Sequence, residues 1–159
     1  MEGCVEVVRG AFVGYRSHAS PPYIRNVRPY EKLVAWHQCH RLALLTYKVT
    51  DNFPKSELYG LTSQMRRAAV SAAANIAEGS AKRGFPELRR FLDIALGSLS
   101  ELSYLGMLAR DLRLLTADSW KDLDRVRTEA GRTTMGLYKA IARRTDPKGN
   151  HQPTNRPTD

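Results

Sequence analysis

The sequence has few cysteines and no long apolar run. Its two cysteines, Cys4 and Cys39, lie far apart and form no disulfide framework of the kind that small secreted proteins use. No uninterrupted apolar run approaches the roughly 20 residues that a membrane-spanning helix needs. Arg9 and Arg16 break the apolar stretches near the N-terminus, where a signal peptide would need one. We therefore expect a cytoplasmic protein with no membrane partner.

The motifs of common catalytic sites are also missing. The sequence contains no Gly-x-Ser-x-Gly elbow for a nucleophilic serine and no Gly-x-x-x-x-Gly-Lys loop for a phosphate. No glutamate is followed three residues later by a histidine, the pairing that di-iron carboxylate bundles use. His37, Cys39 and His40 lie close together, but no second group with metal-like spacing accompanies them. We expect no enzyme activity, no metal and no cofactor.

Acidic residues are too few to balance the basic ones. The chain has 25 Lys and Arg against 16 Asp and Glu, which gives a net charge of +9. Such an excess suits a polyanionic partner, nucleic acid before an anionic membrane surface. From residue 30 to residue 145 there are 19 basic and 12 acidic residues, so the excess is not confined to the ends of the chain. The alternative is a face kept basic for solubility.

Glycine and proline divide the chain into three parts. Residues 1–29 show no sustained period and read as a largely irregular N-terminal extension, either an added contact segment or the product of an upstream start. Residues 146–159 are polar and proline-rich, which predicts a disordered tail. Residues 30–145 form the predicted domain, and a chain that is 42% hydrophobic has enough apolar residues for a core.

Apolar residues at steps of three and four predict four helices within that domain. Their approximate ranges are 30–50, 55–79, 86–112 and 117–144. We expect Ser56 to cap the start of the second helix, Gly79 to end it, and Thr116 or Asp118 to cap the fourth. Short connections favour an all-α, up-down-up-down four-helix bundle. The third helix carries two apolar stripes, more than one bundle should bury, which indicates a shared face in an oligomer.

Two stretches carry a recognisable pattern: residues 57–79, ELYGLTSQMRRAAVSAAANIAEG, and residues 91–102, FLDIALGSLSEL. With Tyr30 and Trp36, they resemble the four-helix-bundle family of 23S rRNA intervening-sequence proteins. That family is related to the accessory variability protein that works beside the reverse transcriptase of diversity-generating retroelements. The resemblance implies a ring-shaped homo-oligomer, a homopentamer without enzyme activity, whose partner is nucleic acid or a reverse transcriptase.

Basic residues gather near the turn between the second and third helices and along the fourth. The residues that we predict to contact phosphates are Lys82, Arg83, Arg89, Arg90, Arg125, Arg132, Lys139 and Arg143. Because no aromatic platform interleaved with basic residues is apparent, we expect contact with the backbone of RNA, or less readily of DNA, and no reading of bases. The leading hypothesis is a nucleic-acid-binding accessory factor. The alternative is a protein–protein assembly module that partners a reverse transcriptase.

A polar stripe lies beside the apolar one on the second helix and faces polar residues of the third. Its members are Gln64, Arg67, Ser71, Asn75, Glu78, Ser98 and Glu101. Buried polar groups need partners, because an unpaired one costs about 1–3 kcal/mol. The stripe is therefore either a structural hydrogen-bond network that fixes helix register or a binding site within the bundle, and we favour the first interpretation.

Overall fold

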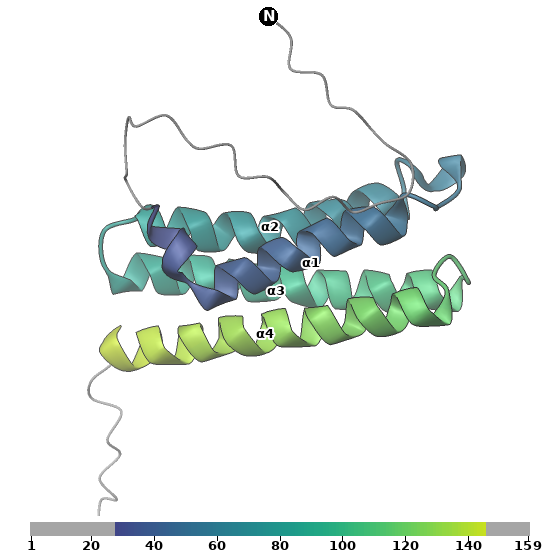
Figure 1. The fold of residues 1–159 in the computed structure, drawn as a ribbon. Coiled ribbons are helices and arrows are strands. Elements are labelled where there is room, and N and C mark those ends of the chain that lie inside the picture. The colour runs from purple at the N-terminus through teal and green to yellow at the C-terminus, as the bar shows by residue number, and fades with distance from the viewer. Residues whose placement is uncertain (1–27, 146–159) are drawn as a thin grey trace, which may run out of the picture.

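The structure is a computed structural model that describes residues 28–145, and this part of the chain is all-helical (Figure 1). Its elements are the short 3-10 helices η1 (Pro29–Lys32) and η2 (Lys55–Glu57) and the α-helices α1 (Val34–Thr50), α2 (Leu61–Ala81), α3 (Phe85–Asp111) and α4 (Ala117–Thr145). Successive helices run in opposite directions, and α4 also packs against α1. The prediction of four helices is confirmed. Residues 1–27 of the predicted extension and the predicted tail 146–159 lie outside the described residues.

The apolar faces of all four helices meet along the axis of the bundle. The largest buried apolar side chains are Leu42, Met65, Ile76, Leu92, Leu102 and Leu123. Burial of each such side chain contributes about 1.5–3 kcal/mol to folding. Buried alanines of α2 allow its neighbours to approach closely; they are Ala68, Ala69, Ala72 and Ala73.

Of the two apolar stripes predicted on α3, one is buried and the other is partly exposed. Leu92 and Leu99 lie in the core, whereas Ile94 and Leu112 are 42% and 56% exposed. By length and composition, α3 is the one described helix apolar enough to cross a membrane. The same features arise in a helix that packs between two others, and α3 lies between α2 and α4.

The predicted starts of the first two helices are wrong. Tyr30 belongs to η1, and Leu33 is extended, with φ −96° and ψ 116°, so α1 begins only at Val34. Ser56 lies in η2 and does not cap α2. The capping role falls to Glu57, whose Oε2 accepts a hydrogen bond from the backbone N–H of Leu61 at 3.1 Å. A carboxylate in this place also interacts favourably with the positive end of the helix dipole.

Gly79 does not end α2, which continues to Ala81. Its role is close approach: Gly79 is buried, and a Cβ added there would lie 2.6 Å from the Cβ of Phe91 on α3. The turn that follows is made by Gly84, whose φ of 89° favours glycine. The predicted cap of α4 is confirmed, since Thr116 Oγ1 accepts a hydrogen bond from the Ser119 N–H at 3.2 Å.

Candidate nucleic-acid interface

The positive charge of the bundle is concentrated in one half. The half that contains η1, the α2–α3 turn and the end of α4, here called the basic end, comprises residues 28–42, 71–98 and 131–145 (Figure 1). It holds 11 Lys and Arg against 4 Asp and Glu, a net charge of +7. The opposite end, residues 43–70 and 99–130, holds 9 against 8, a net charge of +1. The charge excess therefore has a location and is not spread evenly over the surface.

Several of the cations predicted to contact phosphates are neutralised by a nearby carboxylate. These ion pairs are Lys82–Glu78 at 3.2 Å, Arg90–Glu87 at 3.2 Å, Arg125–Asp122 at 3.5 Å and Arg132–Glu129 at 2.6 Å. All join residues three or four apart on one helix, and such exposed pairs contribute little to stability. The hydrogen bond from Arg132 lowers the pKa of the Glu129 carboxyl. Arg125 also lies at the opposite end, so the structure does not bring it to the other predicted residues.

Four exposed cations in the α2–α3 turn and in the last turns of α4 make no ion pair with any residue from 28 to 145. They are Arg83 in the turn itself and Lys139, Arg143 and Arg144 in the last turns of α4. Arg144 was not among the predicted contact residues. Its guanidinium lies 5.1 Å from the centre of the Phe85 ring, and Phe85 opens α3. These four side chains carry positive charge that no described carboxylate offsets. That charge is available to a polyanion.

Arg89 connects α3 to the end of α4. Its Nε donates to the hydroxyl of Tyr138 at 3.4 Å and its Nη1 donates to Thr145 Oγ1 at 3.1 Å. Beside these contacts lies a surface pocket of about 380 Å3, lined by Pro86, Arg89, Arg90, Asp93 and Thr145. Arg89 therefore holds the last turns of α4, and the cations they carry, against the start of α3.

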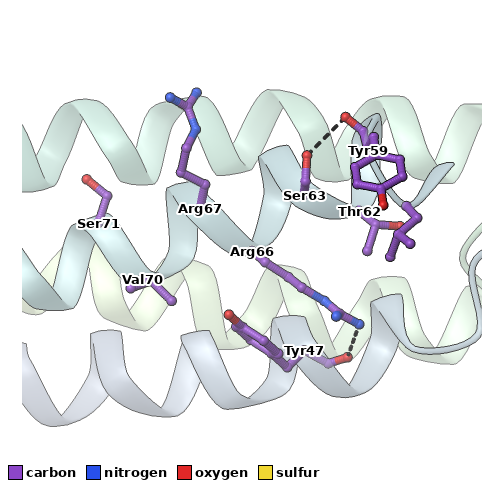
Figure 2. A pocket seen from close by; sticks show the side chains of 9 residues that line it. Tyr47, Tyr59, Thr62, Ser63, Arg66, Arg67, Val70 and Ser71 are labelled. Carbon is purple, nitrogen blue, oxygen red and sulfur yellow. Dashed lines mark hydrogen bonds between the residues drawn. The ribbon is translucent and has the colours of Figure 1, made fainter.

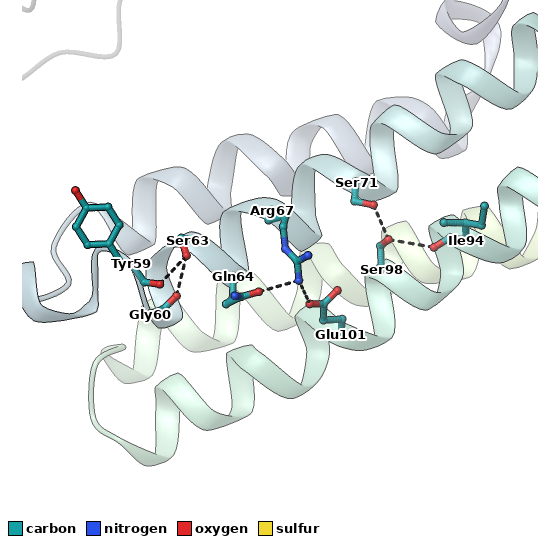
Figure 3. A network of polar contacts seen from close by, with 9 residues as sticks. All are labelled: Tyr59, Gly60, Ser63, Gln64, Arg67, Ser71, Ile94, Ser98 and Glu101. Atoms are coloured by element: carbon teal, nitrogen blue, oxygen red, sulfur yellow. Dashed lines mark hydrogen bonds and ion pairs between the residues drawn. The ribbon is translucent and has the colours of Figure 1, made fainter.

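The predicted polar stripe forms two sets of contacts between α2 and α3 (Figure 3). Arg67 Nη2 donates to Gln64 Oε1 at 2.8 Å and to Glu101 Oε1 at 2.9 Å. One helical turn farther along, the hydroxyls of Ser71 and Ser98 lie 2.8 Å apart. Each set joins a side chain of α2 to one of α3 and so links the two helices at a defined register.

The remaining two members of the stripe lie on α2 and do not reach α3. Asn75 Nδ2 donates to the backbone oxygen of Ser71 at 2.8 Å and to its hydroxyl at 3.1 Å, which extends the network. Glu78 pairs with Lys82 and lies outside it. Because the polar groups between α2 and α3 are paired with one another, the contacts favour the structural interpretation over a binding site.

The Ser71–Ser98 contact gives a stability test. Ser98→Ala should lower the free energy of unfolding by about 1–2 kcal/mol, because it removes the hydrogen bond between α2 and α3 and leaves the Ser71 hydroxyl only its contact with Asn75. Ser100 is a matched control, since both serine hydroxyls bond the backbone oxygen four residues earlier at 3.0 Å, but Ser100 is exposed. Ser100→Ala should leave stability unchanged or slightly raised. If both variants lowered the free energy of unfolding in urea by the same amount, the hydrogen bond between the helices would contribute nothing to stability.

A groove of about 670 Å3 lies at the opposite end, between α1 and the start of α2 (Figure 2). Its wall includes Tyr59, which is 90% exposed, and Tyr47, whose ring lies 4.7 Å from the Arg66 guanidinium. Thr62 Oγ1, also in the wall, is buried without a hydrogen-bond partner among the described residues. The sequence does not reveal the groove, because its wall combines Tyr47 of α1 with residues of α2 and with residues 58 and 59, which follow η2.

His37, Cys39 and His40 do not come together. His37 Nε2 lies 2.9 Å from a backbone oxygen of η1, and the His40 ring stacks on Trp36 with centroids 5.1 Å apart. The Cys39 thiol lies in the core, 3.5 Å from Thr134 Oγ1, and burial raises its pKa. Within the described part of the chain, no group of three or more His, Cys, Asp or Glu residues is arranged to hold a metal ion.

Comparison with known proteins agrees with this architecture. The sequence profile of the 23S rRNA-intervening sequence protein family matches residues 31–136. The chain belongs to this family. A crystal structure at 1.70 Å of a protein of unknown function from the S23 ribosomal protein family of Bacteroides thetaiotaomicron is similar in fold, with a TM-score of 0.60 and 21% identity over 67% of this chain and 99% of the other. No curated protein matches the chain.

The profile of the 23S rRNA-intervening sequence proteins covers only part of the basic end. The match includes the α2–α3 turn with Arg83 but stops at residue 136. Lys139, Arg143 and Arg144 therefore lie in the part of α4 that extends beyond the matched segment. The described fold holds that extension in place through Arg89.

Proposed function

We propose that this protein is a non-enzymatic accessory factor that binds the phosphate backbone of nucleic acid, RNA in preference to DNA, through its basic end. The observation that carries the proposal is the uneven charge, with 11 basic against 4 acidic residues in one half and 9 against 8 in the other. A surface kept basic for solubility has no need to collect its charge at one end. Phosphate contacts release condensed counterions, which gives affinity without reading sequence.

The exposed cations support this use of the basic end. Arg83, Lys139 and Arg143 are exposed, carry no ion pair within residues 28–145, and come from two different segments of the chain. Their attraction for a polyanion is therefore not offset by a carboxylate of the same helix. Arginine and lysine side chains at such places position a nucleic-acid backbone by charge and shape.

Binding to unrelated RNAs tests the proposal. We expect the protein to bind RNAs of the same length and different sequence with affinities within about threefold, because backbone contacts carry no base information. Single-stranded DNA of the same sequences should bind more weakly. Filter binding with purified full-length protein would measure both. A single RNA sequence bound far more tightly than the rest would contradict backbone recognition, and absence of binding to every RNA would contradict the function itself.

Self-association is the second part of the proposal. The family resemblance implies a ring of five subunits, and α3 exposes more apolar surface than a monomer needs, including Ile94, Tyr104, Met107 and Leu112. A ring would repeat the basic end in each subunit and multiply its charge. Light scattering at micromolar concentration should therefore give a mass several times 17.9 kDa. A stable monomer would contradict this part.

The groove favours a second candidate, an assembly module that partners a reverse transcriptase. Tyrosine and arginine are enriched at the energetic centres of protein interfaces, and the groove presents Tyr47, Tyr59 and Arg66 beside the half-exposed Leu58. Co-purification with a retroelement reverse transcriptase that resists ribonuclease and high salt would favour this candidate. Co-purification that ribonuclease abolishes would favour the first.

A further inference from the structure

Phe85 is an exposed aromatic residue that the packing of the bundle does not explain. It opens α3 at the basic end, 43% of its surface is exposed, and it does not belong to the set of side chains packed against the core. An exposed phenylalanine forgoes the stabilisation that burial would give it. Its one ring contact in the described residues is with a cation, the Arg144 guanidinium at 5.1 Å.

The other Phe, Tyr and Trp side chains of this end are buried or partly buried. Phe91 is 5% exposed, and Trp36 has the ring of Tyr30 at 4.7 Å and that of His40 at 5.1 Å. Phe85 differs because nearly half of its surface remains open.

The surroundings of Phe85 are rich in cations without acidic partners among the described residues. Arg83 precedes it by two residues, and Arg143 and Arg144 come from the last turns of α4. An aromatic face beside a guanidinium is the arrangement on which proteins stack unpaired bases, while neighbouring cations hold the phosphates. The sequence showed no such platform because Phe85 and Arg144 are far apart in the chain.

We propose that Phe85 and Arg144 form a stacking site for an unpaired base and make the basic end selective for single-stranded over double-stranded RNA. This inference rests on the proposed function and names the form of nucleic acid that the same site prefers. Bases in a duplex already stack on their neighbours, so Phe85 gains nothing from them. The cations contact phosphates in either form. Affinity common to both forms comes from the cations, and the preference for a single strand comes from Phe85.

The test measures how removal of one aromatic side chain changes the affinity of the protein for two forms of RNA. The probes are fluorescently labelled oligo(U) of about 12 nucleotides, within the range that single-strand sites cover, and a duplex of equal length. Full-length Phe85→Ala protein should bind oligo(U) about tenfold more weakly than the unmodified protein does. Its affinity for the duplex should stay within about twofold of the unmodified protein's. Phe85→Trp should retain the single-strand preference. Leu44→Ala, which removes a 60% exposed apolar side chain at the opposite end, should change neither affinity.

Each other outcome overturns the inference in a distinguishable way. Equal weakening on both probes would mean that Phe85 acts through the fold or the assembly. Unchanged binding of oligo(U), or a changed mass in light scattering with the single-strand preference kept, would assign the ring to another role, such as a protein partner or a second subunit. Equal binding of both probes by the unmodified protein would overturn the inference and leave the proposed function standing. Binding of neither probe would overturn both.

Discussion

Reversing two charges at the α2–α3 turn should weaken RNA binding by at least about tenfold, about 1.4 kcal/mol, while the bundle stays folded. The double variant is Lys82→Glu with Arg83→Glu. Arg83 has no acidic partner within residues 28–145, and Lys82 loses an exposed pair with Glu78 and a contact of 5.5 Å with the Phe91 ring. A phosphate that these side chains no longer neutralise keeps its condensed counterions, so the salt dependence should flatten. Filter binding at two salt concentrations measures both effects.

The matched control reverses the same charge at the opposite end. Lys55 and Lys121 are exposed and form no ion pair with a described residue, and Lys55→Glu with Lys121→Glu changes the net charge by the same amount. We expect its RNA affinity to stay within about threefold of the unmodified protein, since distant exposed charges are screened by salt. Melting temperatures of both variants should change little. Equal decreases in affinity would mean that net charge alone attracts RNA and that the basic end is not a site.

Gly79→Ala should destabilise the bundle, contrary to the usual benefit of alanine in a helix. The new Cβ would lie 2.6 Å from the Cβ of Phe91, which cannot rotate away, so α2 and α3 must separate. Overpacking of this kind costs about 1–3 kcal/mol, against a gain of up to about 1 kcal/mol in helix propensity. We expect a net decrease of about 1–2 kcal/mol in the free energy of unfolding, seen in urea as a lower midpoint with an unchanged slope.

Gly97 supplies the control for this prediction. It lies in the middle of α3, and a Cβ added there would meet no atom within 4 Å. Gly97→Ala should therefore stabilise the protein by up to about 1 kcal/mol, from helix propensity alone. The two substitutions are chemically identical and are expected to have opposite signs. A decrease in stability at both positions, or at neither, would contradict the close approach of α2 and α3 at Gly79.

Helix number and core residues followed from the sequence because both depend on a local period. Leu92 and Leu102, which share one of the apolar stripes of the third helix, are both buried. The starts of α1 and α2 did not follow, because η1 forms where it packs against α2 and η2 where the chain turns after Pro54. The helix stop predicted at Gly79 is wrong because a terminal glycine and a close-packed glycine look the same in one sequence.

The candidate site was predictable as a region and not in its details. The concentration of basic residues near the α2–α3 turn is visible in the sequence. The pairing of Lys82 with Glu78 and of Arg90 with Glu87 also has a sequence signal, the spacing of four and three residues on one helix. The contact of Phe85 with Arg144 has no sequence signal, since it joins the start of one helix to the end of the next.

The salt dependence of RNA binding by the unmodified full-length protein tests the central claim most directly. If Arg83, Lys139, Arg143 and Arg144 contact phosphates of a single strand, the logarithm of the binding constant should fall with the logarithm of salt concentration with a slope of about −3. Affinity should then drop by roughly fiftyfold between about 50 and 200 mM salt. An affinity that stays constant over this range, or no RNA binding at the lower salt concentration, would contradict a backbone-binding role for the basic end.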